Sequence, residues 1–318
     1  MLELQPCPPV PSWHLKRTPA FGKGIPMLPR TDNRLRIGGP VYVDERIPEK
    51  LVEAHRRSGF AAAFDPGVED PALLEEIKAA YREADIVIAE TGAFVINMLD
   101  PDEERRQANI DRICRRLERA DRVGSLCCVA HGGSPNPRNL LAHNPENFSR
   151  ATFDGIVKAV QQIIDRVEPT CTRFVLETES RILPDNPDSY LEILEAVDRS
   201  AFAVHLDPIN ITSSPRRFYF SGEFIRDCFS KLGPWIVSSH AKDIQMVPGA
   251  QVRFEETFCG NGGIDFDSYI TELVRLESDV PLMIEHVTPR QLPWARDYLF
   301  QRAEAVGVEI RNGECRRA

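Results

Sequence analysis

Short apolar runs alternate along the chain with longer segments in which apolar residues recur every three or four positions. Eight such runs have the length and apolar character of strands that are buried on both faces of a parallel sheet. They occupy residues 36–43, 60–64, 85–89, 125–130, 173–176, 202–206, 236–239 and 281–284.

The segments between the runs predict amphipathic helices. The clearest covers residues 101–123, with Asp100 as the N-cap, Pro101 in the first turn and Gly124 as the stop. Similar periodicity marks residues 153–167, 224–232, 266–276 and 295–306. Eight strands, each followed by a helix, predict an α/β fold of the closed (β/α)8 type, the TIM barrel.

The predicted barrel is a single domain over residues 35–310 of the 318-residue chain. Residues 1–34 are rich in proline and predict an irregular N-terminal arm, and residues 311–318 predict a C-terminal tail. No G-x-G-x-x-G or P-loop motif follows a strand, which excludes the common open-sheet nucleotide folds. Residues 244–263 predict a long loop that borders the site and helps to cover a ligand.

Composition narrows the class of partner. The formal net charge of −9 argues against a nucleic-acid partner, which usually leaves a basic footprint. No apolar run is long enough to span a bilayer, and the first residues lack the apolar core of a signal peptide. The eight cysteines contain no C-x-x-C pair and are interpreted as buried reduced thiols. We therefore expect a cytoplasmic protein that binds a small molecule, with the oligomeric state open, a homo-oligomer included.

Four polar residues directly follow the last four apolar runs. They are Glu177, Asp207, His240 and Glu285. In a TIM barrel such positions lie together at the C-terminal mouth, where active sites are built. Three carboxylates in one low-dielectric mouth would repel each other unless a cation lies among them. The set therefore predicts one divalent metal ion, with Mn²⁺ expected and Mg²⁺, Co²⁺ and Zn²⁺ as alternatives.

The segments VLETE, HLDPIN, SSHAKD, FCGNGGIDF and LMIEH resemble those of the xylose isomerase-like TIM-barrel superfamily, the sugar phosphate isomerase/epimerase family. The resemblance covers roughly residues 35–308. Members include ketose 3-epimerases, hydroxypyruvate isomerases, inosose dehydratases and, more distantly, endonuclease IV. The resemblance implies that Glu177, Asp207, His240 and Glu285 bind the metal. It also matches a family glycine motif with residues 260–262, and a family lysine with Lys242.

Three positions depart from the pattern of the ketose 3-epimerases. Leu183 stands where these enzymes carry a substrate-binding Glu, Met246 where they carry an Arg, and Asn210 where they carry a His. These departures point away from a free-ketose 3-epimerase. The further His and carboxylate ligands of endonuclease IV are also not evident.

Other polar residues at the predicted mouth are candidates for substrate binding. They are His131, Lys242, Asn210 and Glu90. His131 is followed by glycines that would leave room for a ligand, although a structural role fits His131 and Glu90 equally well. His205 is expected to point inward one layer below Asp207 and to orient a ligand. His286 is expected to point away from the site.

The combined interpretation is a metal-dependent isomerase or epimerase of a keto-sugar or related polyol. Glu177 and Glu285 would be catalytic and would move a proton through a metal-stabilised enediolate. The alternative is a metal-dependent lyase, either a dehydratase of an inosose-like substrate or an enzyme that cleaves a 3-oxo-glycoside, with the same enolate chemistry. A barrel that uses the ion only for structure or binding is a further alternative.

Overall fold

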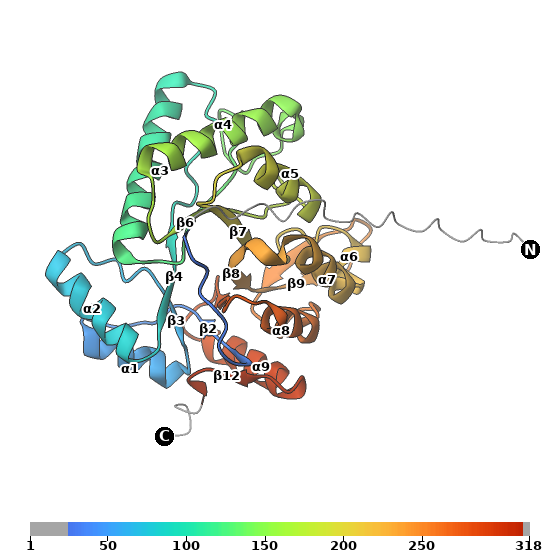
Figure 1. Cartoon of the computed structure of the whole chain (residues 1–318). Coiled ribbons are helices and arrows are strands. Elements are labelled where there is room, and N and C mark those ends of the chain that lie inside the picture. The colour runs from blue at the N-terminus through green and yellow to red at the C-terminus, as the bar shows by residue number, and fades with distance from the viewer. Residues whose placement is uncertain (1–24, 314–318) are drawn as a thin grey trace, which may run out of the picture.

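Eight parallel strands close into a barrel within residues 25–313, the part of the chain that the computed structural model describes. The strands follow each other around the barrel in the order β11-β2-β3-β4-β5-β6-β7-β8, so each neighbours the next one in sequence. Figure 1 shows the helices surrounding these strands. The predicted TIM barrel is confirmed.

The barrel strands are β2 (Ile37–Gly38), β3 (Ala62–Phe64), β4 (Val87–Gly92), β5 (Cys127–Ala130), β6 (Arg173–Glu177), β7 (Phe202–Leu206), β8 (Ile236–Ala241) and β11 (Leu282–Ile284). The helices are α1 (Pro48–Ser58), α2 (Pro71–Glu83), α3 (Glu103–Val123), α4 (Arg150–Val167), α5 (Pro187–Val197), α6 (Pro215–Tyr219), α7 (Ser221–Leu232), α8 (Phe266–Arg275) and α9 (Leu292–Ala305), with 3-10 turns at Pro145–Phe148 and Gly233–Trp235. Two small sheets pair β1 (Arg34–Leu35) with β12 (Glu309–Ile310), and β9 (Asp243–Met246) with β10 (Phe254–Thr257).

The start of α3 differs from the prediction. Its N-cap is Asp102, whose side chain accepts the backbone N–H of Arg105 at 2.9 Å. Asp100 was predicted to be the cap, but its side chain accepts the N–H of Asp102 and forms the turn before the helix. The predicted stop is confirmed, because Gly124 ends α3 with φ 77°, a conformation that glycine adopts without strain.

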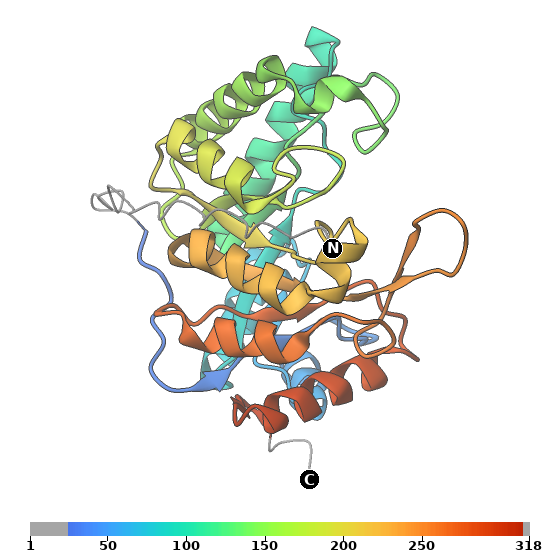
Figure 2. The same ribbon diagram turned by 90° about the vertical axis from the view of Figure 1, so that its right-hand side faces the viewer.

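The predicted long loop at residues 244–263 is wrong in its secondary structure. Strands β9 and β10 form an antiparallel hairpin with Glu256 opposite Ile244. Figure 2 shows this hairpin, coloured orange, standing out beyond the barrel on the side of the loops that follow the strands. The run at 36–43 is shorter than predicted too, because only Ile37 and Gly38 pair in β2.

Two irregularities of register reshape the barrel interior. The pairing of β3 with β4 shifts between Ala63 and Phe64, so that Phe64 lies opposite Glu90. The pairing of β7 with β8 shifts between Val204 and His205. Such bulges change which side chains face inward and are frequent beside active sites. The shift in β4 gives Glu90 the orientation of its partner Cys127, a residue of the cluster inside the barrel.

The N-terminal end of the barrel is closed by the ion pairs of two buried arginines. Arg36 is 5% exposed and pairs with Asp279 at 2.7 Å and with Asp85 at 2.6 Å. Arg311, after β12, pairs with Asp85 at 3.0 Å and with Asp32 at 2.6 Å. These contacts fix the end of the barrel opposite the predicted site. In TIM barrels the N-terminal face usually serves stability, whereas the C-terminal face carries the active site.

Six cysteines lie in the described residues, and all of them are free thiols. Five are buried as expected, but Cys171 is exposed. Cys7 and Cys315 lie outside the described residues, as does most of the predicted arm at 1–34. Among residues 25–313, none of the helices combines the length and apolar character needed to cross a bilayer.

Candidate metal centre

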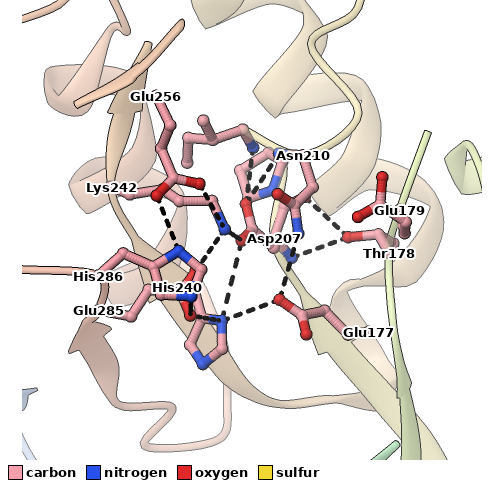
Figure 3. A network of polar contacts seen from close by, with 12 residues as sticks. Glu177, Thr178, Glu179, Asp207, Asn210, His240, Lys242, Glu256, Glu285 and His286 are labelled. Atoms are coloured by element: carbon pink, nitrogen blue, oxygen red, sulfur yellow. Dashed lines mark hydrogen bonds and ion pairs between the residues drawn. The ribbon is translucent and has the colours of Figure 1, made fainter. Parts of the chain in front are cut away.

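Four side chains from four neighbouring strands meet at the C-terminal mouth of the barrel. Glu177 ends β6, Asp207 directly follows β7, His240 lies near the end of β8, and Glu285 directly follows β11. One ligand atom from each of the four can be chosen so that all lie within 4.8 Å of one another. Figure 3 shows the side chains converging. The convergence predicted from the strand ends is therefore present in the structure.

His240 faces the carboxylates with a single ring nitrogen. Its Nδ1 lies 3.1 Å from Glu177 Oε1, 3.1 Å from Glu285 Oε2 and 3.8 Å from Asp207 Oδ2. Asp207 and His240 are almost fully buried. The other ring nitrogen of His240, Nε2, faces away from these three carboxylates and contacts a different residue.

Glu90 holds that opposite side. His240 Nε2 lies 3.0 Å from Glu90 Oε2, and His205 Nε2 lies 3.0 Å from Glu90 Oε1. Ser238 donates a hydrogen bond to Glu90 from the same layer. The sequence left substrate binding and a structural role equally open for Glu90, and in the structure it lies inside β4 and is 1% exposed. His205 occupies the inward layer predicted for it.

Lys242 supplies positive charge at the other edge of the cluster. Its Nζ lies 2.7 Å from Asp207 Oδ2 and forms an ion pair with Glu285, while the side chain is only 2% exposed. Lys242 was expected to position substrate oxygens. The structure places its ammonium group directly against two of the four predicted ligands.

The charges of the site hold one another ionised. Burial raises the pKa of Glu285, but attraction to His240 and Lys242 outweighs burial and keeps that pKa far below its usual range. Burial likewise raises the pKa of Glu177, but its hydrogen bond and attraction to His240 lower it overall to about 2. Burial lowers the pKa of His240, yet Glu90 and Glu285 raise it well above its usual value. The cluster thus carries concentrated negative charge that requires cations.

The four residues fit a divalent metal ion. The donor set is three carboxylates and one imidazole, which suits hard and borderline divalent ions. Asp207 Oδ1 accepts the N–H groups of Ile209 and Asn210 at 3.0 Å, whereas its buried Oδ2 points at the cluster and lies 2.7 Å from Lys242 Nζ and 3.8 Å from His240 Nδ1. The Glu90 contact leaves Nδ1 of His240 directed at the same point, in the manner of carboxylate–histidine–metal arrangements.

Two further predicted residues lie against Glu177. Asn210 Nδ2 donates to Glu177 Oε1 at 3.2 Å, and His131 Nε2 lies 3.7 Å from Glu177 Oε2. Burial lowers the pKa of His131, although Glu177 opposes this shift, so the imidazole is held neutral. The glycine after His131 does not make room for a ligand. A side chain at Gly132 would collide with the carbonyl oxygen of Leu183, so this glycine serves loop packing.

The hairpin contributes residues that the sequence did not single out. Glu256 on β10 lies 2.8 Å from His286 Nδ1 and 3.7 Å from Lys242 Nζ (Figure 3). His286 Nε2 lies 3.6 Å from Glu285 Oε2, so His286 does not point away from the site as expected. Polar and apolar residues do not alternate clearly in the sequence FEET of β10, and residues 247–253 separate β9 from β10. The sequence therefore did not indicate that Glu256 lies beside the site.

The glycine motif at residues 260–262 wraps around a buried carboxylate. Asp243 accepts N–H groups from Gly260, Gly262 and Ile264 at 3.1, 3.2 and 3.1 Å. Gly262 sits so close that a Cβ would collide with Asp243. The motif therefore fixes the return of the hairpin to α8 rather than contacting a ligand directly.

Comparison with known proteins identifies a family for the chain and solved structures with a similar fold. A family model described as "Xylose isomerase-like TIM barrel" matches residues 51–304. No curated protein sequence matches the chain. Among solved structures, endonuclease IV from Thermus thermophilus superposes with a TM-score of 0.64 and 13% identity, covering 86% of this chain and 100% of that one.

Two other structures superpose to a similar extent. D-psicose 3-epimerase with D-tagatose from Clostridium cellulolyticum gives a TM-score of 0.59 and 14% identity, covering 83% of this chain and 94% of that one. The probable 3-DHS dehydratase AsbF from Bacillus anthracis gives 0.59 and 16%, covering 83% of this chain and 97% of that one. At these identities the likeness shows the fold alone, and the three proteins are named for three different reactions.

Proposed function

The chain belongs to the xylose isomerase-like TIM barrel family, and from this premise we propose that it is a metal-dependent isomerase or epimerase of a keto-sugar or related polyol. One observation carries the proposal. Glu177 and Glu285 direct one carboxylate oxygen each at the same ring nitrogen of His240, and each keeps a second oxygen. Two bases on either side of one metal position are what a proton transfer between neighbouring carbons requires.

The second oxygens of the two glutamates have different surroundings. Glu177 Oε2 faces the imidazole of His131 at 3.7 Å, whereas Glu285 Oε1 is paired with the ammonium group of Lys242. The ammonium group stabilises the ionised form of Glu285, so Glu177 is the more available base. We assign proton removal to Glu177 and proton return to Glu285, which would pass on a proton donated by the neighbouring ammonium group of Lys242.

A divalent ion held by Glu177, Asp207, His240 and Glu285 would supply Lewis acidity to the carbonyl and adjacent hydroxyl of the substrate. The remaining residues position these groups. Asn210 and His131 orient Glu177, and Glu90 fixes the His240 ring. Glu256 and His286 lie at the rim, where they can contact substrate hydroxyl groups.

A lyase is the second candidate. Leu183 and Met246 occupy the positions of the epimerase Glu and Arg, and one solved structure with the same fold is named a probable dehydratase. The Lys242 ammonium beside Glu285 could protonate a leaving group beta to the carbonyl. Elimination would create an enone that absorbs in the ultraviolet, whereas isomerisation would not.

The proposed function is tested on the purified protein by metal analysis and then by a panel of keto-sugars and oxidised glycosides in deuterated water. An isomerase or epimerase incorporates solvent deuterium at the reacting carbon and produces no enone. A metal-loaded protein that neither exchanges deuterium nor releases a product with any member of the panel would count against enzymatic enolate chemistry.

A further inference from the structure

A groove rich in arginine lies on the outer side of the barrel, beside the loop that leads from β4 to α3. Its volume is about 870 Å³, and it is bounded by the end of β4, the loop after β3 and one face of α3. We call it the arginine groove and define it by Arg112, Arg115, Arg116, Arg119, Gly92 and Phe94. None of these six residues belongs to the metal centre.

The arginines come from one face of one helix. Positions 112, 115, 116 and 119 are three and four residues apart, so the side chains lie over the same stretch of α3. Like charges at this spacing repel each other and destabilise a helix. A row of this kind therefore needs anionic partners, from the protein or from outside it.

The protein supplies partners for one of the four. Arg119 is buried and pairs with Asp65 at 2.6 Å and with Glu69 at 2.8 Å. These are also the carboxylates of the loop after β3 that line the groove. Arg119 is thus neutralised and fixes that loop against α3.

The other three arginines lack such partners. Among residues 25–313, no ion pair forms to Arg112, Arg115 or Arg116, although the protein has a net charge of −9. Arg116 Nε donates to the carbonyl oxygen of Gly92 at 2.7 Å, and Arg112 Nη1 donates to the side-chain oxygen of Asn109 at 3.2 Å. The Gly92 contact fixes the Arg116 guanidinium while leaving its two terminal nitrogens available.

We propose that the arginine groove binds the phosphate or carboxylate group of a small anionic ligand. Planar guanidinium groups match the paired oxygens of such anions, and Arg116 is already held in place for this contact. Phe94 is 41% exposed and offers an apolar wall for the carbon skeleton of the ligand. Its ring also packs edge-on against His131, with 6.0 Å between the ring centroids, and Glu90 lines the groove as well, so the groove adjoins the residues around the metal centre.

The test is equilibrium dialysis of the full-length protein with radiolabelled inorganic phosphate at constant ionic strength. Arg112→Ala/Arg116→Ala should weaken phosphate binding about tenfold or more, because charge-assisted hydrogen bonds are lost. The matched control is Arg82→Ala/Arg122→Ala, which removes the same charge from positions outside the groove and should leave binding within about twofold of wild type.

Arg112→Lys/Arg116→Lys keeps the charge and removes the planar fork, so it should bind phosphate with intermediate affinity. Equal binding by the wild type and by Arg112→Ala/Arg116→Ala would overturn the proposal. It would place phosphate elsewhere, for example on a metal ion in the barrel mouth.

The same assay identifies the source of the anion. Competition between phosphate and a substrate turned over at the metal centre would make the groove the holder of the anionic end of that substrate. Phosphate binding that is sensitive to the arginine variants but not to the substrate would make it a site for a separate anionic ligand. In both outcomes phosphate binding depends on Arg112 and Arg116. This part of the test therefore does not depend on the proposed reaction at the metal centre.

Discussion

His240 Nε2 lies 3.0 Å from Glu90 Oε2, on the side of the ring away from the three carboxylates that face Nδ1. One carboxylate inside the barrel thereby determines which ring nitrogen is available to a metal ion. Removal of a partner of this kind typically weakens metal affinity by about 10- to 100-fold.

Glu90→Gln should therefore reduce the affinity for Mn²⁺ by about 10- to 100-fold in competition titrations with a metal indicator. Turnover at saturating metal should fall far less, because Glu90 is buried below the substrate position. Glu255→Gln, on the exposed face of the hairpin, is the control and should bind Mn²⁺ like the wild type. An unchanged affinity of Glu90→Gln would show that the ring is oriented by other contacts.

Glu285 is assigned both metal binding and proton transfer, whereas Asp207 is assigned metal binding alone. Glu285→Gln should keep part of the metal affinity but lose turnover by a factor of about 10² to 10⁴, the usual effect of losing a general acid or base. Asp207→Asn should lose activity mainly through weaker metal binding, so excess Mn²⁺ should restore part of it.

The comparison is made at saturating metal with the occupancy of each variant measured. Exchange of substrate hydrogen with solvent deuterium reports the proton transfer separately from the overall reaction. Normal turnover in a fully occupied Glu285→Gln enzyme would show that Glu285 does not return the proton and would leave both steps to Glu177 and His131.

The β9–β10 hairpin is predicted to act as a partial cover of the site. Deletion of residues 248–252, at its tip, should lower kcat/KM by about tenfold, the equivalent of roughly 1.4 kcal/mol of transition-state stabilisation. The reason is that the hairpin carries Glu256 to His286 and Lys242. Glu256→Gln leaves the hairpin intact and separates the effect of the carboxylate from that of the cover. Kinetic constants equal to those of the wild type would refute a covering role.

His55 should make the stability of the fold depend on pH. Burial lowers its pKa to about 4, although its hydrogen bond to Leu51 opposes this shift. In the unfolded chain the pKa is about 6.5. Between these pH values the unfolded chain takes up a proton that the native protein does not, so this contribution to stability is present above pH 6.5 and is lost as the pH falls to 4.

The loss amounts to about 3 kcal/mol in the free energy of unfolding. His55→Gln should flatten this part of the pH profile in denaturant unfolding, whatever its effect on stability at neutral pH. His143→Gln, at a position that is not buried, should leave the slope as in the wild type. Parallel profiles for His55→Gln and the wild type would show that His55 is not the titrating group.

The fold, and the convergence of the four residues of the candidate metal centre, could be predicted from the sequence alone. Eight buried runs separated by amphipathic segments are compatible with few folds other than the closed barrel, and residues 202–206 match β7 at both ends. Glu177, Asp207, His240 and Glu285 each directly follow a buried run. Because parallel strands all end at one face of the barrel, their local positions were sufficient to bring them together.

The surroundings of these four residues depend on contacts that form only in the folded chain. A register shift in β4 turns Glu90 into the barrel, and simple alternation along a strand cannot reveal such a shift. Glu256 reaches the rim because two strands pair across the hairpin, and Lys242 is buried because Asp207 and Glu285 converge on it. These contacts join residues far apart in sequence, so their energy depends on packing that no local pattern of hydrophobic and polar residues records.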